Sequence, residues 1–466
     1  MQTIHERPGL PGLHPQVRSR LVDLRFDSPE PTDRLRVHIL EAFPDGTPSS
    51  EYPTRYPLIL LLHGFPELAY SWRKVLQPLA NEGYHVVAPD QRFYGKSVSE
   101  MTDKVTGQVT LKTDRISYQD SLRPFHILNM VDDVTALVKK LGHSSVHTVV
   151  GHDFGSMLAG YCVLAKPSLF RSVIFVSMPF MGANPPGGGS HQRATADPTQ
   201  PRSLASVTQS IQPLLARLPE PRTHYSAYFS TPTANHDLLA LGPRLPEFLK
   251  GYYYIKSASW PMNKPYRLAC ADHPHASTQA LVDDLAKLPH YYVMPVHATM
   301  PDVVRQSAGV VPDLRWLTAE ELAVYACEFE RTGFQGGLNG YRSALCPPPF
   351  ELESRLQAYA KGSIEMPAAF IGGAKDWGVF QTPGADSRSK ELCTYGPDGR
   401  LPEENFVLIE GAGHWVQQEQ PEDFVSTVKR FLQGWNLVSS PSHALKTNNF
   451  FMSNALCSNL RPTTWT

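Results

Sequence analysis

The sequence has almost no net charge: 43 lysines and arginines stand against 44 aspartates and glutamates, for a formal net charge of -1 at pH 7. Without a basic surplus, nucleic acid and anionic membrane surfaces are not indicated as partners. No run of eighteen apolar residues occurs, which argues against a membrane-spanning helix. Residues 1–16 are polar and contain prolines such as Pro8 and Pro11, so a secretory signal is not indicated either. We expect a cytoplasmic protein that binds a small, largely uncharged molecule.

The cysteines are few and scattered. None stands in a C-x-x-C pair or in the Cys/His spacing of a zinc site, so neither a metal site nor a disulfide framework is indicated. No internal repeat is visible either. The six cysteines are Cys162, Cys270, Cys327, Cys346, Cys393 and Cys457.

Short apolar runs recur along the chain and indicate an α/β fold. Residues 58–62 form an unbroken apolar run, typical of a strand buried on both faces of a parallel sheet. Residues 130–141 have the apolar spacing of a helix that connects two such strands. We therefore predict a mostly parallel sheet with helices on both faces. The other predicted strands are a leading hairpin of 21–26 and 35–42, then 86–88, 146–150, 173–176, 368–371 and 406–409.

The predicted strands at 173–176 and 368–371 are separated by too many residues for a crossover helix. About 190 residues lie between 176 and 368, which predicts an inserted domain, rich in aromatic residues and helical pattern. Proline-rich segments near 185–189 and 347–349 resemble connections between units. We expect a first part of the core in 1–180, a mainly helical cap in 181–351, a second part of the core in 352–437, and a disordered tail in 438–466.

Residues 151–155 read Gly-His-Asp-Phe-Gly, between a predicted strand and a predicted helix at 156–165. A tight turn in this position holds its central side chain clear of the sheet, ready to react. The side chain here is Asp153, a carboxylate that is ionised at neutral pH and can attack a saturated carbon to form an ester with the protein. No G-x-S-x-G occurs anywhere in the chain, so a serine esterase is excluded.

Two further polar side chains, Asp376 and His414, follow the last two predicted strands. Since sites in open α/β sheets form outside the carboxyl ends of the strands, we expect both residues to meet Asp153. His414, oriented by Asp376, is suited to take a proton from a water molecule that attacks the ester. The backbone N–H groups of Phe65 and Phe154 are placed to hold the resulting oxyanion.

Several motifs together resemble the α/β-hydrolase-fold epoxide hydrolases, and the resemblance covers roughly 21–435. It implies an α/β-hydrolase core with an inserted cap, and hydrolysis of an epoxide to a vicinal diol without metal or other cofactor. In that family two cap tyrosines protonate the epoxide oxygen. The motifs are His-Gly-Phe-Pro-Glu at 63–67, Ser-Trp at 71–72, Asp-Gln-Arg-Phe-Tyr-Gly-Lys-Ser at 90–97, Gly-His-Asp at 151–153, Lys-Asp-Trp at 375–377 and Gly-His-Trp at 413–415.

The resemblance also selects candidates for the two cap tyrosines. Residues 333–342, Gly-Phe-Gln-Gly-Gly-Leu-Asn-Gly-Tyr-Arg, match the motif of the second tyrosine and select Tyr341. Tyr225 matches the first by its place and neighbours, with Tyr228 and the tyrosines of 252–254 as rivals. A phenol stays protonated at neutral pH and can donate to an oxygen that becomes an alkoxide. The aromatic cap indicates a hydrophobic epoxide as substrate.

Two alternatives remain. A dehalogenase with an aspartate nucleophile would use the same ester and the same histidine, but such enzymes tend to carry Trp or Arg after the nucleophile, where this chain has Phe154. The second alternative is a non-catalytic protein with the same fold, and the presence of Asp153, Asp376 and His414 argues against it.

The chain also departs from the family pattern. Phe93 and Ser156 stand where glycine is usual or frequent, and the segment 100–123 is expected to be a long loop. The segments 185–201 and 263–313 are long as well. The end of the chain, from Asn436 to Thr466, is expected to be unstructured or weakly docked.

Overall fold

The computed structural model describes residues 9–24, 35–47, 56–102, 109–112, 116–183, 204–273, 277–345, 355–356, 358–359 and 362–439. A ten-stranded sheet forms its centre, with strand order β12-β11-β8-β7-β3-β4-β2-β5-β6 and β1 paired to β2. The strands are β1 Arg18–Leu24, β2 Leu35–Ala42, β3 Leu58–Leu62, β4 His85–Pro89, β5 Val98–Thr102, β6 Val109–Lys112, β7 Val146–His152, β8 Val173–Val176, β11 Ala368–Gly373 and β12 Phe406–Ile409, and a separate two-stranded sheet is made of β9 Arg222–His224 and β10 Val293–Pro295.

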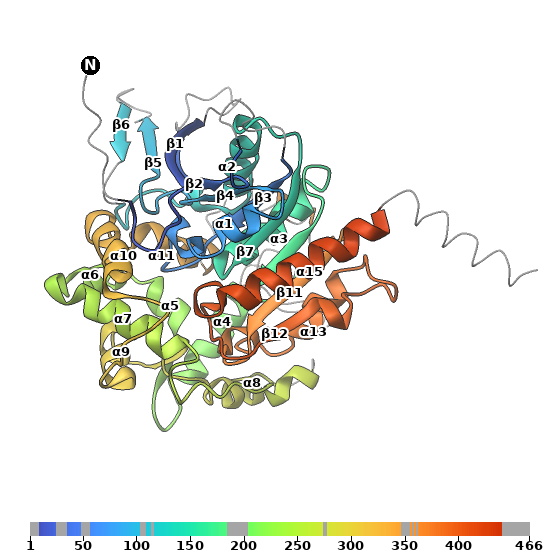
Figure 1. Ribbon diagram of the computed structural model, residues 1–466. Helices are drawn as coiled ribbons and strands as arrows, with labels where there is room; N and C mark the ends of the chain where they lie inside the picture. The colour runs from blue at the N-terminus through green and yellow to red at the C-terminus, as the bar shows by residue number, and fades with distance from the viewer. Residues whose placement is uncertain are drawn as a thin grey trace, which may run out of the picture.

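Helices lie on both faces of the sheet (Figure 1). The α-helices are α1 Leu76–Ala80, α2 Ile127–Lys140, α3 Phe154–Ala165, α4 Leu204–Leu215, α5 Tyr225–Phe229, α6 Ala234–Leu239, α7 Leu245–Lys256, α8 Thr278–Leu285, α9 Met300–Ala308, α10 Ala319–Thr332, α11 Gln335–Leu345, α13 Ala385–Leu392, α14 Val416–Glu419 and α15 Pro421–Ser439. The 3-10 helices are η2 Ala69–Trp72, η3 Arg123–Phe125, η4 Gly242–Arg244, η5 Ala269–Asp272, η6 Trp377–Val379 and η7 Glu403–Asn405.

The six strands from β12 to β4 run parallel, as the apolar pattern predicts. Side chains of β3 alternate between two apolar clusters: Leu58, Leu60 and Leu62 pack with α2 and α3, while Ile59 and Leu61 pack with α1 and α15. Because successive side chains of a strand point to opposite faces, an unbroken apolar run needs cover on both. The sheet is thus the middle layer of three.

The described part of the long segment between β8 and β11 is mainly helical, and its apolar cluster, rich in tyrosine and phenylalanine, continues into the core through Phe65, Leu68, Tyr70, Tyr94, Trp377 and Trp415. Figure 1 shows α5, α6, α7, α9 and α10, in green to yellow, gathered on one side of the molecule. A buried ion pair joins this segment to the core, where Nε of Arg73 lies 2.7 Å from Oε1 of Glu321 on α10. Among the described residues, no helix combines the length and apolar character needed to cross a membrane.

Four sequence predictions need correction or lie outside the described residues. The segment 100–123 is not simply a long loop, because β5 and β6 form an antiparallel pair within and next to it. Helix α15 ends at Ser439, so the segment from 436 begins as helix. The leading hairpin is present as β1 and β2, although Phe26 lies outside the described residues. The segment 185–201, Cys346, Cys457 and residues 440–466 also lie outside them.

Candidate functional site

Asp153 stands on the turn between β7 and α3, with backbone angles φ 54° and ψ -117°. Positive φ is strained for a residue with a side chain, at a cost of about 1 to 3 kcal/mol, and such strain clusters at functional sites. Close packing enforces the turn: a Cβ atom on Gly155 would overlap the carbonyl oxygen of Leu62 at the end of β3. Only glycine fits there, so strand and helix approach closely and the Asp153 side chain is presented at the carboxyl edge of the sheet.

The two carboxylate oxygens of Asp153 have different surroundings. The backbone N–H of Phe65 donates a hydrogen bond of 3.0 Å to Oδ1. Oδ2 faces His414, whose Nε2 lies 3.4 Å away. The N–H of Phe154, the second predicted oxyanion donor, starts α3, and within the described part of the chain it makes no hydrogen bond to this carboxylate. Oδ1 is therefore held by a backbone donor, and Oδ2 remains available for attack.

His414 and Asp376 form a buried pair beside Asp153. Nδ1 of His414 lies 3.1 Å from Oδ2 and 3.2 Å from Oδ1 of Asp376. The Asp376 carboxylate also accepts a 2.6 Å hydrogen bond from the N–H of Gly378 in η6. With Nδ1 engaged, the Nε2 atom of His414 is directed to Asp153. The structure thus brings together the three residues that follow β7, β11 and β12.

The charges of this site shift the protonation of its members. Burial alone would raise the pKa of Asp153, but the adjacent His414, with Lys256 and His152, outweighs it and holds that pKa well below its usual range. Burial would lower the pKa of His414, yet Asp376 and Asp153 overcome this and raise it to about 9. At neutral pH the resting site therefore holds an imidazolium between two carboxylates.

The two tyrosines selected from the sequence also meet. Tyr341 on α11 and Tyr225 at the start of α5 are buried, with ring centroids 5.7 Å apart. Tyr341 packs edge-on against Phe154, the residue after Asp153, at 4.6 Å. Burial raises the pKa of both phenols, and the charge of Asp153 raises it further, which places the carboxylate within electrostatic reach of both. Both side chains are thus protonated donors close to Asp153.

A close approach of α11 to the core sets the place of Tyr341. A Cβ atom on Gly337, one turn before Tyr341, would meet the ring of Phe65 at 2.5 Å and the hydroxyl of Tyr94 at 2.7 Å. Glycine at this position lets the helix lie directly on the loop that carries the Phe65 N–H. Close packing of α11 on the core therefore explains the glycine at position 337, independently of the resemblance to the family motif.

Tyr225 and its rivals differ in what their hydroxyls contact, and that of Tyr225 donates to Oε1 of Gln381 at 3.4 Å. The hydroxyl of Tyr228 donates to Asp237 at 3.0 Å, and that of Tyr253 donates to the carbonyl of Pro66 at 2.7 Å. The Tyr252 hydroxyl is buried without a hydrogen-bond partner among the described residues. Among the tyrosines in described positions, Tyr225 is the one whose ring contacts Tyr341.

A buried network behind the site was not predicted from the sequence. Oε2 of Glu67 lies 2.5 Å from Nδ1 of His152, and Nε2 of His152 lies 2.7 Å from the carbonyl oxygen of His414. Ser177 also donates to that carbonyl, at 2.9 Å. Glu67 and His152 both lie inside the motifs quoted above, so their positions could have signalled a role. Their pairing could not, because 85 residues separate them.

A second carboxylate, Glu419, anchors the loop that carries His414. It accepts hydrogen bonds from the backbone N–H groups of Gly413 at 3.1 Å and Trp415 at 3.0 Å, and from that of Ala258 at 2.8 Å. Burial raises the pKa of Glu419 to about 7 in spite of these three donors. Glu419 thereby ties the His414 loop to the end of α7.

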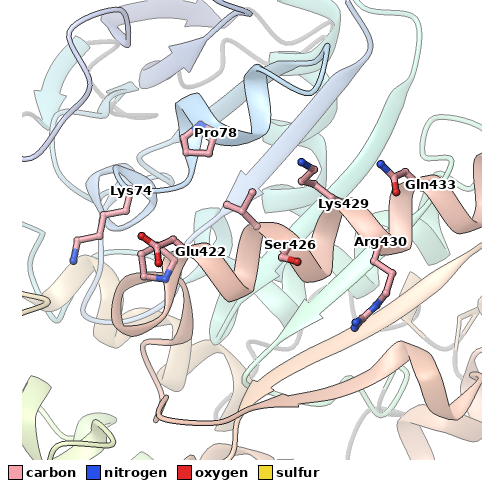
Figure 2. Close-up of a pocket in the computed structure, with 9 residues that line it drawn as sticks. Lys74, Pro78, Glu422, Ser426, Lys429, Arg430 and Gln433 are labelled. Carbon is pink, nitrogen blue, oxygen red and sulfur yellow. The ribbon is translucent and has the colours of Figure 1, made fainter.

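No group of three or more histidine, cysteine or acidic side chains with the arrangement of a metal site is present in the described part of the chain. A surface groove of about 660 Å³ lies between α15 and the region of α1 (Figure 2). Its lining includes Lys74, Pro78, Glu422, Lys429 and Arg430, and none of the candidate site residues. The groove is therefore separate from the chemistry described above.

Comparison with known proteins agrees with this architecture. A family model described as alpha/beta hydrolase fold matches residues 57–213. Epoxide hydrolase A of Mycobacterium tuberculosis is 28% identical over 414 residues, which cover 87% of this chain and 99% of that protein. Epoxide hydrolase 3 of Siraitia grosvenorii is 27% identical over 383 residues, covering 81% and 92%. The crystal structure of epoxide hydrolase A from Mycobacterium thermoresistibile is 29% identical with a TM-score of 0.60, covering 90% and 98%.

The protein therefore has the α/β-hydrolase fold, as predicted from the order of its strands and motifs. The resemblance to the epoxide hydrolases within that fold is likewise confirmed, over most of the chain.

Proposed function

We propose that this protein is an epoxide hydrolase that converts a hydrophobic epoxide to a vicinal diol through an ester on Asp153. The observation that carries the proposal is the pair of buried phenols, Tyr225 and Tyr341, beside an aspartate on the nucleophile turn. A serine hydrolase has no use for two such donors, whereas ring opening of an epoxide needs a proton for the leaving oxygen. The substrate and water are the only reactants that this chemistry requires.

In the first step Oδ2 of Asp153 attacks an epoxide carbon. Oδ1 is held by the Phe65 N–H at 3.0 Å, which leaves Oδ2 as the free nucleophile. The carbon–oxygen bond of the ring breaks, and its electron pair stays on the oxygen, which takes a proton from Tyr225 or Tyr341. Since both phenols have raised pKa values, they are fully protonated before the reaction.

In the second step a water molecule attacks the acyl carbon of Asp153. Ester formation removes the negative charge that helps to raise the pKa of His414. The imidazole can then release its extra proton to solvent and act as a base, with its Nδ1 held by Asp376 at 3.1 Å. The oxyanion develops on Oδ1, next to the Phe65 N–H, and we propose the N–H of Phe154 as the second donor.

The proposed substrate class follows from the surroundings of the two phenols. Phe65, Phe154 and Phe229 all have rings within 5.7 Å of the Tyr341 ring, centroid to centroid. Aromatic side chains without charge favour an apolar ligand. We therefore propose a hydrophobic epoxide, and residues 181–351 as the cap that covers it.

A dehalogenase is the second candidate, because the ester and its hydrolysis would be the same. Its leaving group is halide, which needs hydrogen-bond donors but takes no proton, so proton transfer from two phenols has no part in its departure. Phe154, beside the nucleophile, offers neither an N–H nor a charge from its side chain, and its ring packs on Tyr341 instead. The arrangement therefore favours the epoxide.

The test is a single turnover with excess protein and styrene oxide in water enriched in oxygen-18. Because water attacks the acyl carbon, the diol of the first turnover should contain no label, and the Asp153 peptide should gain one labelled oxygen. His414→Gln should instead accumulate protein whose mass is increased by one substrate, located on Asp153. Asp153→Asn is the matched control and should form no adduct.

Three results would contradict the proposal. Label in the first diol would mean direct attack of water on the epoxide. Halide release from haloalkanes or haloacetate, with no turnover across an epoxide panel, would favour the dehalogenase. No reaction in either assay would favour a scaffold without catalysis.

A further inference from the structure

Lys256, the last residue of α7, places a buried ammonium group next to the candidate site. The residue is 4% exposed. Its Nζ lies 4.7 Å from the ring centroid of Tyr292, 5.2 Å from Tyr252, 5.6 Å from Tyr291 and 5.9 Å from Tyr225. Among the described residues, the partners of this ammonium are the four tyrosine rings, and it forms no direct ion pair. A buried cation is costly unless other charges compensate it, so its retention here needs a reason.

The backbone of Lys256 is fixed to the loop that carries the candidate base. Its carbonyl oxygen accepts a 2.9 Å hydrogen bond from the N–H of His414. Two residues later the N–H of Ala258 donates to Glu419, which also anchors the His414 loop. One residue thus contacts the His414 loop through its backbone and Tyr225 through its side chain.

The charged groups that face Lys256 come from three core loops. Burial holds the pKa of Lys256 below its usual range, and the carboxylates of Asp153 after β7, Asp376 after β11 and Glu67 after β3 oppose this by favouring its ammonium form. His414 faces the same carboxylates together with the ring of His152, and Lys256 lowers its pKa. Lys256, at the end of α7, is therefore a cation that interacts electrostatically with both Asp153 and His414.

We propose that Lys256 is a positioning residue whose ammonium stabilises the negative charge as it passes from Asp153 to the epoxide oxygen and the Tyr225 phenol. The inference rests on the proposed function. When Oδ2 of Asp153 bonds to carbon, the ring carbon–oxygen bond breaks with its electrons on oxygen. That oxygen takes the phenol proton, so one negative charge now resides on the tyrosine side.

The charge returns after hydrolysis. His414 takes a proton from water, the ester bond breaks, and the departing diol oxygen receives that proton. The Asp153 carboxylic acid then ionises, its proton restores the phenol, and His414 takes back from solvent the proton that it released when the ester formed. Throughout this cycle one negative charge is present near Lys256, first on the core side and then on the side of Tyr225.

The experiment compares Lys256→Met, which removes the charge, with Lys256→Arg, which keeps it. Lys250→Met is the matched control, because Lys250 lies on the same helix and pairs with the exposed Asp313 at 3.4 Å. Rapid-quench single turnovers with styrene oxide, read by intact mass, give the rates of ester formation and ester hydrolysis separately across pH. Circular dichroism and thermal melting establish that each variant is folded.

We expect Lys256→Met to form the ester about 10-fold more slowly, because only the excess of the attraction of Lys256 for the Tyr225 side over its attraction for Asp153 speeds this step. The upper limit is roughly 100-fold, the full effect of a charge about 6 Å away at an effective dielectric constant of about 20. Lys256→Arg and Lys250→Met should stay within about threefold of the wild type. Ester hydrolysis should need a higher pH in Lys256→Met, because His414 without the neighbouring cation holds its proton more tightly.

Two results would overturn the inference. One is an unchanged rate of ester formation in folded Lys256→Met. The other is an equal loss in the Met and Arg variants with an unmoved pH profile, which would mean that Lys256 only packs. If Lys256→Met does not fold, Lys256→Gln takes its place. Failure of the proposed function is a different result, because then the wild type and Lys250→Met would form no ester either.

Discussion

The charge coupling between Asp153 and His414 leads to a direct prediction: Asp153→Asn should lower the pKa of His414. Nε2 of His414 lies 3.4 Å from Oδ2 of Asp153, and both side chains are buried. Coulomb's law at that distance, with an effective dielectric constant of about 20, gives about 5 kcal/mol. At 1.36 kcal/mol for each pKa unit, this is an upper bound of about 3.6 on the fall in pKa. The pKa of His414, about 9 in the resting protein, should therefore fall to roughly 6 to 7.

The assay is a titration of ring signals by nuclear magnetic resonance in protein labelled at histidine, with His414→Gln used to assign the signal. Asp237→Asn is the control, because Asp237 lies on α6 and is not among the charges that act on His414. A pKa that stays near 9 in Asp153→Asn would refute the reasoning. Formation of the ester would then not release the proton of His414, and the proposed base would remain charged when it is needed.

Three further predictions follow from the site and its attachment. Tyr341→Phe should lower kcat/KM for an aryl epoxide by roughly 100-fold, the usual cost of one donor to a developing oxyanion, while Tyr228→Phe should leave it within about twofold in the same steady-state assay. Arg73→Met should lower the free energy of unfolding in urea by about 3 to 5 kcal/mol, since it leaves the Glu321 carboxylate buried without its 2.7 Å partner; the exposed Arg305→Met should cost less than about 1 kcal/mol. The pKa of His414 is raised from 6.5 to about 9, so its contribution of about 3 kcal/mol is present below pH 6.5 and is lost as pH rises through 9. Between pH 6.5 and pH 9.5 the melting temperature should therefore fall more in the wild type than in His414→Gln. An equal fall in both proteins would contradict this.

Much of the core could be predicted because its strands are buried on both faces. An apolar run as short and unbroken as Leu58–Leu62 is typical of a central strand, and parallel strands bring their carboxyl ends to one edge. That rule alone predicts that Asp153, Asp376 and His414 meet, and the structure places them together. Their catalytic roles remain a proposal.

Other features carry no local signal. The pair β5 and β6 lies in a polar segment without clear alternation, so its strands resemble a loop in the sequence. Lys256 ends an amphipathic helix, where a lysine usually faces solvent, and its burial follows only from the four tyrosines around it. The selection of Tyr225 over Tyr228 likewise depends on a contact in the folded protein, that of the Tyr225 ring with the Tyr341 ring on α11.

The Phe65 N–H explains why a carboxylate suits this turn without further activation. In the resting site it donates to Oδ1 of Asp153, at 3.0 Å. In the proposed ester Oδ1 would be the carbonyl oxygen, and in the proposed tetrahedral intermediate it would carry the negative charge. The same donor thus faces the same atom in three successive states, so no reorganisation is needed when the charge develops. A serine at this position would put the oxyanion on the substrate, which would have to enter the space between Phe65 and the turn.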